Sequence, residues 1–261
     1  MALEDKVALV TGAGRGMGRA IAIALAGDGA TVALSDIDVE TLEEATTTVR
    51  AMGNPALAIQ ADVGDLSDID RMVKETVDTF GRVDILVNNA GVTRYLNIMD
   101  VREEDWDRIH RVNAKGVFFC MQKVAAELIR QSQGGRIINI ASIAGTFGGP
   151  TSSPPYAAAK AGLVNLTTVA AAALAQYGIR VNAIAPGIIN PPFHAPVDIA
   201  IGQEQLGLKP GEHIHTRVSL IPLGRLGEPE DIAATVAFLA SEDASHISGE
   251  TITVAGAMRS L

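Results

Sequence analysis

Short β-branched runs alternate with longer helical patterns along the whole chain, and this alternation limits the fold more than any other feature. Seven runs have the composition of strands: Val7–Val10, Thr31–Leu34, Ala56–Ile59, Ile85–Val87, Arg136–Ile140, Arg180–Ile184 and Thr251–Val254. Strands joined by helices run parallel, because a helical crossover returns the chain to the end of the sheet where it started. The sequence therefore predicts an α/β fold with a doubly wound parallel sheet and helices on both faces.

The chain gives no sign of an internal domain boundary, so residues 1–261 are expected to form a single domain. Its first helix carries an apolar stripe at helical spacing, made by Met17, Ala20, Ile21, Ala24 and Leu25, before Gly27 and Gly29 end it. Residues 190–217 break the rhythm with four prolines and one short helical possibility. Such a long insertion after a strand predicts a substrate lid, with a solvated surface excursion as the alternative.

Charge and cysteine content exclude several classes of partner. The 261 residues hold 21 Lys and Arg against 30 Asp and Glu, a formal net charge of -9 that repels nucleic acid and anionic membranes. No apolar run approaches the roughly 18 residues of a membrane span. The one cysteine, Cys120, lies in an apolar run and is expected to be buried. These features, with a charged N-terminal segment, favour a cytoplasmic enzyme.

A glycine-rich turn joins the first strand to the first helix and suits the binding of a dinucleotide. Glycines let the backbone approach a pyrophosphate, and the helix start offers unpaired N–H groups. Asp36 ends the second strand, where a carboxylate can accept both hydroxyls of an adenosine ribose. Asp36 is also explicable as a turn residue or helix cap, although Asp38 can fill that structural role instead. The residues of the turn predicted to hold the cofactor are Gly12, Arg15, Gly16, Met17 and Gly18.

Further polar and small residues follow the later strands. Asp62 and Val63 come after the third strand, and Asn88-Asn89-Ala90-Gly91 after the fourth. Ser142 follows the fifth strand, and Tyr156 and Lys160 share one face of the next helix because they are four residues apart. A nearby ammonium favours the ionised form of a phenol, so this pair suits acid/base chemistry near neutral pH. Each of these patterns is common when it occurs alone.

Together these motifs resemble the short-chain dehydrogenase/reductases over essentially the whole chain. The matching residues are Thr11-Gly12-x-x-x-Gly16-x-Gly18, Asp62-Val63, Asn88-Asn89-Ala90-Gly91, Asn113, Ser142, Tyr156-x-x-x-Lys160 and Pro186-Gly187. The resemblance implies a Rossmann-type fold and hydride transfer between a nicotinamide and an alcohol or carbonyl carbon. It also implies that Tyr156 exchanges the proton, Ser142 holds the substrate oxygen, Lys160 lowers the pKa of Tyr156 and binds the nicotinamide ribose, and Asn113 positions a water. The cofactor contacts that it adds are Asp62, Val63, Asn89, Ala90, Gly91, Pro186, Gly187 and Ile189.

The sequence departs from the family pattern at three places. Ser142 and Tyr156 are 14 residues apart, one more than usual, and a bulge within 151–155 is expected to absorb the extra residue. Pro191 stands where the family often has a threonine that bonds the nicotinamide amide, so backbone groups of Ile188 and Ile189 would replace it. The last strand ends in Val254-Ala255-Gly256-Ala257 instead of the usual aspartate and paired glycines, which leaves the contacts made there open.

Two aromatic residues and two histidines complete the candidates. Tyr95 and Phe193 are expected to line the substrate pocket, with ordinary packing as the alternative. His213 and His215 have no third ligand set beside them, so no metal site is predicted.

The sequence favours NAD over NADP, because Asp36 repels a 2'-phosphate more strongly than the exposed Arg15 attracts it. The expected substrate is a small or medium alcohol or carbonyl compound. A reductase of carrier-protein-linked 3-oxoacyl groups and a catalytically silent dinucleotide-binding protein are the alternatives. The helix over 157–177 is apolar nearly all round, which predicts a homo-oligomer, a tetramer by resemblance to the family.

Overall fold

The computed structural model of the protein describes residues 2–147, 153–190, 207, 209, 212 and 216–258. The predicted lid at 190–217 falls almost entirely outside these residues, as do Phe193, His213 and His215. So does the expected bulge at residues 151 and 152.

Seven strands form one parallel sheet, which confirms the predicted fold class. The strands are β1 (Val7–Thr11), β2 (Thr31–Asp36), β3 (Ala56–Gln60), β4 (Ile85–Asn88), β5 (Gly135–Ile140), β6 (Ile179–Pro186) and β7 (Thr251–Val254). They lie in the order β3-β2-β1-β4-β5-β6-β7, and every neighbouring pair is parallel. The chain therefore moves outward from β1 in one direction and then returns to add β4 on the other side.

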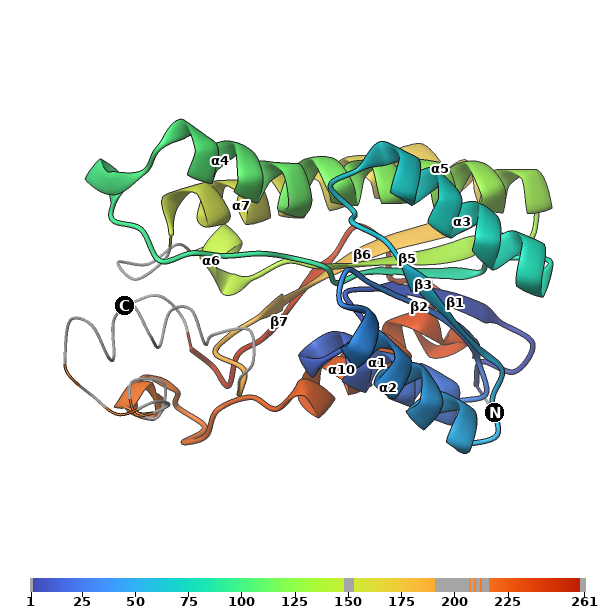
Figure 1. The fold of residues 1–261 in the computed structure, drawn as a ribbon, viewed down its shortest axis with the longest axis horizontal. Helices are drawn as coiled ribbons and strands as arrows, with labels where there is room; N and C mark the ends of the chain where they lie inside the picture. The colour runs from blue at the N-terminus through green and yellow to red at the C-terminus, as the bar shows by residue number, and fades with distance from the viewer. Residues whose placement is uncertain are drawn as a thin grey trace.

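Two layers of helices cover the sheet (Figure 1). One layer holds α3 (Leu66–Phe80), α4 (Glu103–His110), α5 (Val117–Gln131) and α7 (Pro154–Leu174), and the other holds α1 (Gly16–Gly27), α2 (Val39–Ala51) and α10 (Pro229–Ala240). Shorter pieces are η1 (Ile98–Asp100), the π-helix η2 (Arg111–Gly116), α6 (Ile143–Thr146), η3 (Ala175–Tyr177), η5 (Arg217–Leu220) and η6 (Glu242–Ala244). The connections after β1 and β4 leave toward opposite layers, so the carboxyl ends of these two strands flank the crevice where ligands of such sheets bind.

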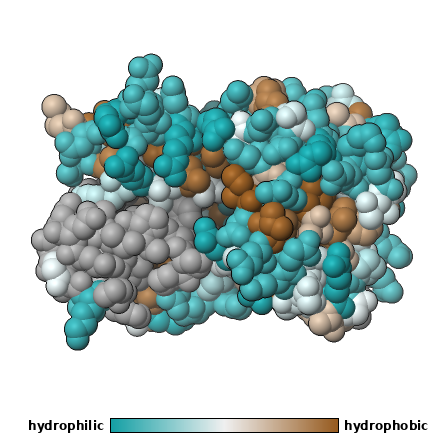
Figure 2. Space-filling model, viewed as in Figure 1, coloured by the Kyte–Doolittle hydropathy of each residue, from teal (hydrophilic) through white to brown (hydrophobic). Residues whose placement is uncertain are grey.

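The strands have apolar residues on both faces because both faces are covered. Val10 and Ile138 pack toward the layer of α1, α2 and α10, and their neighbours Leu9 and Ile137 pack toward the opposite layer. Cys120 is buried in the second of these cores, as expected. The surface in Figure 2 is mostly polar, with apolar side chains gathered along the boundary between the two helix layers. The sheet therefore has the two-sided core that its sequence predicts.

The buried face of α1 lies one residue away from the predicted stripe. Ile21 and Leu25 are buried as expected, but their fully buried companions are Gly18, Ala22 and Ala26. Met17, Ala20 and Ala24 are only partly buried against the same core. Small residues occur on both sides of this helix, so the close packing of Gly18 decides which side faces the sheet.

The helix α7 and its continuation η3 are long and apolar enough to pass a test of length and composition for a membrane span. In the fold this helix packs on β6 and α6 and carries Lys160, which is buried against the carbonyl of Ile140. Its apolar residues are therefore explained on one side by the sheet.

Candidate functional site

The glycine-rich turn between β1 and α1 fits a pyrophosphate by its shape. A Cβ on Gly18 would lie 2.0 Å from the carbonyl oxygen of Gly12, and Gly12 and Gly16 have φ values of 64° and 53° that other residues rarely adopt. Helix α1 starts after Arg15, whose side chain makes no capping bond, and its first turn has no acidic residue. The N–H groups and positive end of this helix therefore face the turn without a side-chain acceptor, which suits an anion.

Asp36 stands at the end of β2 with its carboxylate turned toward the glycine-rich turn. One oxygen accepts the N–H of Gly14 at 2.9 Å, and the other accepts the N–H of Asp38 at 3.1 Å. Asp38 itself is the N-cap of α2 and accepts the N–H of Thr41, so it fills the capping role that Asp36 could have had. Asp36 therefore positions the turn, and the second lone pair of each oxygen can accept from a ribose hydroxyl.

The residue after Asp36 was missed by the sequence reasoning. Ile37 is 63% exposed although it is a large apolar residue at the end of a buried strand. An exposed apolar side chain beside a carboxylate that can accept from a ribose suits the flat face of an adenine. The only sequence signal was its place next to Asp36.

The loop after β3 carries an ion pair that the sequence did not predict. One oxygen of Asp62 accepts the N–H of Gly64 at 2.7 Å, and the other lies 3.4 Å from a guanidinium nitrogen of Arg111. Val63 is buried beside it. Arg111 comes from the helical segment beyond β4, far along the chain, so no local pattern indicated this contact.

The Asn-Asn-Ala-Gly segment ties β4 to β1. The amide of Asn89 donates to the carbonyl oxygens of Thr11 and Gly12, both at 2.9 Å, and the hydroxyl of Thr11 accepts the N–H groups of Asn89 and Ala90 at 3.1 Å. A Cβ on Gly91 would lie 2.8 Å from the side-chain oxygen of Asn113. These bonds fix the two strand ends on either side of the crevice.

Asn113 lies in the π-helix η2 and uses its side chain to hold the loop after β4. Its amide donates to the carbonyl oxygens of Val92 at 2.8 Å and Ile109 at 2.9 Å, and its oxygen accepts the N–H of Val92 at 3.1 Å. The position of Gly91 brings Asn113 and Lys160 to the same place, because a Cβ there would also lie 3.8 Å from the ammonium nitrogen. The water that Asn113 is expected to position stays a prediction.

Ser142, Tyr156 and Lys160 come together where β5 ends and α7 begins. Ser142 caps the short helix α6 by accepting the N–H of Ala144, and it is hydrogen-bonded to Tyr156. The ammonium of Lys160 donates to the carbonyl oxygen of Ile140 at 2.6 Å and lies 5.7 Å from the centre of the Tyr156 ring. The extra residue between Ser142 and Tyr156 therefore does not separate their side chains.

Burial shifts the pKa values of Tyr156 and Lys160 in opposite directions. Burial raises the pKa of the phenol to about 12, and the hydrogen bond to Ser142 lowers it only in part. Burial also lowers the pKa of Lys160 to about 8. The residue as a whole is half-buried, and desolvation is the largest influence on the pKa of its phenol. The lowering of the Tyr156 pKa by Lys160 stays a prediction. The ammonium of Lys160 bonds to Ile140, and desolvation penalises the charged forms of both residues.

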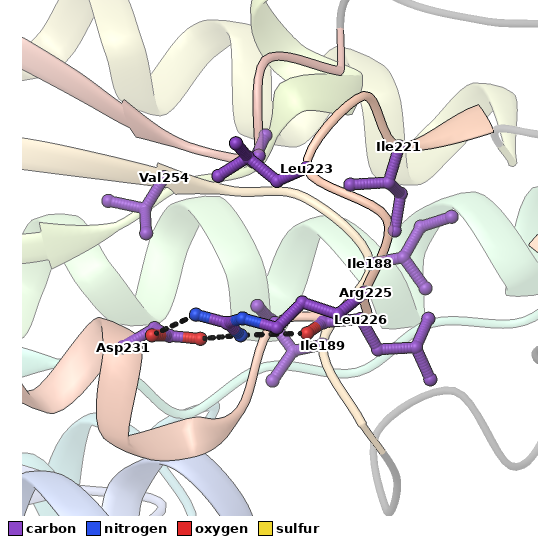
Figure 3. A pocket seen from close by; sticks show the side chains of 11 residues that line it. Ile188, Ile189, Ile221, Leu223, Arg225, Leu226, Asp231 and Val254 are labelled. Carbon is purple, nitrogen blue, oxygen red and sulfur yellow. Dashed lines mark hydrogen bonds and ion pairs between the residues drawn. The ribbon is translucent and has the colours of Figure 1, made fainter. Parts of the chain in front are cut away.

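The segment after β6 is where Pro186, Gly187 and Ile189 lie. Gly187 donates to the carbonyl of Val254 at 3.0 Å, and a Cβ on it would lie 2.8 Å from the Cβ of Ala255. The altered end of the last strand therefore still packs closely on this segment. Ile188 and Ile189 border a cavity of about 190 Å³ formed with residues of the 221–227 segment and the end of β7 (Figure 3).

Tyr95 stays a prediction as a substrate contact. Its hydroxyl lies 3.4 Å from the side-chain oxygen of Asn97, and an ion pair between Arg94 and Asp105 at 2.8 Å ties this loop to α4. Within the part of the chain that the structure describes, no group of three or more His, Cys, Asp or Glu could hold a metal.

Taken together, the fold and the site define a nicotinamide-dinucleotide-dependent enzyme class. The sequence family described as enoyl-(acyl carrier protein) reductase matches residues 12–258. The 3-oxoacyl-[acyl-carrier-protein] reductase FabG of Staphylococcus aureus (strain Mu50 / ATCC 700699) is 43% identical over 97% of this chain and 98% of its own. Galactitol 2-dehydrogenase of Agrobacterium fabrum (strain C58 / ATCC 33970) is 42% identical, covering 98% of both chains.

Solved structures agree with these relatives. Levodione reductase superimposes with a TM-score of 0.92 at 35% identity, with 97% of each chain covered. NAD+-bound xylitol dehydrogenase superimposes with a TM-score of 0.90 at 34% identity, with 98% of this chain and 100% of that chain covered. The chain belongs to the short-chain dehydrogenase/reductase family. It is an oxidoreductase that transfers a hydride between a nicotinamide cofactor and an alcohol or carbonyl carbon.

Proposed function

We propose that this protein is an NAD-preferring dehydrogenase or reductase of small or medium alcohol and carbonyl compounds, with Tyr156 as the general acid/base. The observation that carries the proposal is the hydrogen-bonded pair of Ser142 and Tyr156 beside the buried Lys160. A protein that only bound a dinucleotide would need the glycine-rich turn and Asp36, but not this acid/base group. The intact set therefore argues against a catalytically silent protein.

The described residues fit the cofactor along the whole crevice. Gly12, Arg15, Gly16, Met17 and Gly18 would hold the pyrophosphate, Asp36 the adenosine ribose, and Asp62 and Val63 the adenine. The nicotinamide half would lie among Asn89, Ala90, Gly91, Tyr156, Lys160, Pro186, Gly187 and Ile189. When bound, the dinucleotide supplies or accepts the hydride at its nicotinamide ring.

The protein groups manage the proton. In carbonyl reduction the phenol of Tyr156 donates its proton to the substrate oxygen, and in alcohol oxidation the phenolate takes that proton back. The hydroxyl of Ser142 bonds to the same oxygen and stabilises the negative charge that develops on it. Lys160 adds a positive charge beside the phenol and a donor for the nicotinamide ribose. Asn113 keeps the loop after β4 in place around them.

The preference for NAD is supported by the charges around Asp36. A second negative charge about 4 Å from a carboxylate costs roughly 4 kcal/mol at an effective dielectric constant of 20. Arg15 is exposed, so solvent screens its attraction for a 2'-phosphate. The NAD+-bound xylitol dehydrogenase, which shares the fold, points the same way.

A carrier-protein-linked 3-oxoacyl reductase is the second candidate, because FabG is among the similar relatives. Galactitol 2-dehydrogenase is similar to almost the same degree, and a formal net charge of -9 does not favour docking of an acidic carrier. We therefore place a free small molecule first.

Two further properties that we propose are the oligomeric state and the cellular location. A homotetramer is supported by the apolar outward side of α7, where Val169 is 57% exposed. A cytoplasmic location is supported by the single, buried Cys120, which has no cysteine to pair with in the chain.

Replacing Tyr156 with phenylalanine tests the proposal. Tyr156→Phe removes only the exchangeable proton, so we expect turnover to fall by at least about a hundredfold while the affinity for NADH stays within about twofold. The matched control is Tyr177→Phe at the exposed end of the same helical segment, which should behave as wild type. Reduced-nicotinamide absorbance across sugars, secondary alcohols, ketones and steroids reports turnover, and near-normal turnover by Tyr156→Phe on a substrate of the wild type would refute the role.

A further inference from the structure

The backbone of Ile189 offers a donor and an acceptor side by side beside the nicotinamide position. A parallel bridge joins Ile189 to Gly227, made by the N–H of Gly227 to the carbonyl of Ile188 at 3.0 Å and the N–H of Asn190 to the carbonyl of Gly227 at 2.7 Å. In such a bridge the central residue turns its own N–H and carbonyl to the opposite side. Those two groups match the carbonyl and amino group of a carboxamide. Ile189 thus presents both groups, whereas the carbonyl of Ile188 is used by Gly227.

Packing and backbone bonds hold this segment together. Ile188 packs with Ile221 and Leu226, but the same side chains border the cavity of about 190 Å³ (Figure 3). The side chain of Ile189 is buried in the main core, so packing holds that side chain. The bonds to Gly227 set the direction in which the backbone groups of Ile189 point.

Gly227 is held in turn by a network of charged groups. The guanidinium of Arg225 bonds both carboxylate oxygens of Asp231, at 2.6 and 2.9 Å, and the carbonyl oxygen of Leu226 at 2.9 Å. Asp231 also accepts the N–H of Glu228 at 2.8 Å in the capping box of α10. The residues on both sides of Gly227 are thus fixed to the start of a packed helix. Figure 3 shows this pair of charged side chains next to Ile189.

We infer that Arg225 is a positioning residue for the nicotinamide end of the cofactor, acting on Ile189 through Gly227. The inference rests on the proposed dinucleotide site. It also explains how the chain tolerates Pro191, which lacks the hydroxyl that related enzymes often use at that place. In this inference, the backbone groups of Ile189 replace the hydrogen bond that a threonine side chain would make at position 191.

The ion pair of Arg225 contributes little to the free energy of unfolding, so replacing Arg225 should not unfold the protein. Its side chain is 58% exposed and that of Asp231 is 31% exposed, and exposed ion pairs contribute little to stability. The capping bond from Glu228 to Asp231 remains when Arg225 is replaced. The full-length Arg225→Met variant should therefore fold.

The experiment compares two ligands by calorimetry. NADH carries the nicotinamide, and ADP-ribose is the same molecule without the nicotinamide ring. For Arg225→Met we expect NADH affinity to fall about tenfold, with ADP-ribose within about twofold of wild type. The control Arg130→Met removes another bidentate pair, with Glu127 on α5, and should change neither affinity. Arg225→Lys should recover only part of the loss, because an ammonium cannot make the paired bonds.

A second variant keeps the ion pair and disturbs the bridge instead. A Cβ on Gly227 would lie 2.4 Å from the terminal carbon of Ile189, so Gly227→Ala should reproduce the selective loss of NADH affinity. A further measure is the 3-acetylpyridine analogue, which lacks the amino donor. Wild type should bind NADH more tightly than this analogue, and the ratio of the two affinities should fall toward one in Arg225→Met.

The outcomes separate the two proposals. The positioning role would be overturned if Arg225→Met and Gly227→Ala lost affinity equally for NADH and ADP-ribose, or lost affinity for neither. The proposed function would remain intact. Failure of wild type to bind either ligand would overturn the dinucleotide site and this inference with it.

Discussion

At the scale of single residues, Tyr156 and Lys160 show burial acting in opposite directions on an acid and a base. Burial raises the pKa of the phenol to about 12 and lowers the pKa of the ammonium to about 8. Tyr156 is therefore protonated throughout the neutral range, as a proton donor for carbonyl reduction must be. Lys160 loses its charge as the pH rises through about 8.

The pH dependence of reduction should follow Lys160. The kcat/KM for carbonyl reduction should be flat between pH 6 and 7, within about twofold, and should decline as the pH rises through about 8, where the ammonium deprotonates. Lys160→Arg, which stays charged, should lower the plateau and remove this decline. A decline that persists in Lys160→Arg would show that another group titrates.

Cofactor preference belongs to Asp36. Wild type should prefer NAD over NADP by at least about tenfold in kcat/KM. Asp36→Asn should lose most of this preference, because it removes the charge while its one oxygen can still accept either the N–H of Gly14 or that of Asp38. Asp38→Asn is the control: it also removes one negative charge, from the N-cap of α2, and should keep the preference for NAD. An unchanged preference in Asp36→Asn would make Asp36 a turn residue only.

Sequence reasoning located the residues that follow strand ends but not the partners that hold them. Ser142, Tyr156 and Lys160 could be chosen because strand ends and helical spacing place them together. Arg111 could not, because the topology of the fold brings it to Asp62 from far along the chain. The proposed role of Arg225 could not either, because it depends on the bridge between the distant residues Gly227 and Ile189. The pKa direction of Tyr156 was also beyond the sequence, since it depends on how deeply the phenol is enclosed.

At the scale of elements, the strands were predictable and the details of the helices were not. All seven strands lie where β-branched runs predict them, because both faces of the sheet are buried. The π-helix Arg111–Gly116 has no periodic signature, and it holds Asn113 against Val92 and Ile109. The buried side of α1 was misplaced by one residue because a contact with Gly12 decides it.

Two glycines of α1 should respond oppositely to alanine. Gly18→Ala places a Cβ 2.0 Å from the carbonyl of Gly12 and should weaken NADH binding at least about tenfold. Gly27→Ala meets only the end of Met52 at 3.8 Å and should raise the free energy of unfolding by about 0.5 kcal/mol. Calorimetry and chemical denaturation measure the two effects, and tight NADH binding by Gly18→Ala would contradict the role of the turn.

At the scale of the whole molecule, α7 would link the proposed active site to the proposed assembly. Its inward side buries Ala159, Lys160 and Leu163 against the protein core. Its outward side leaves Ala158, Ala161 and Val169 exposed, in a helix whose outer face would be polar if it faced only water. The same element therefore carries the catalytic pair and the surface expected to meet another copy.

Placing a charge on this surface should dissociate the assembly. Val169→Glu desolvates a carboxylate in the expected contact, so light scattering at micromolar concentration should show a mass shift from tetramer toward dimer or monomer. Met52→Glu alters an apolar residue of similar exposure at the end of α2 and should leave the mass unchanged. Because α7 holds Tyr156 and Lys160, the dissociated variant should also lose activity when diluted. A wild-type monomer, or a Val169→Glu variant of unchanged mass, would show that this face of α7 meets solvent.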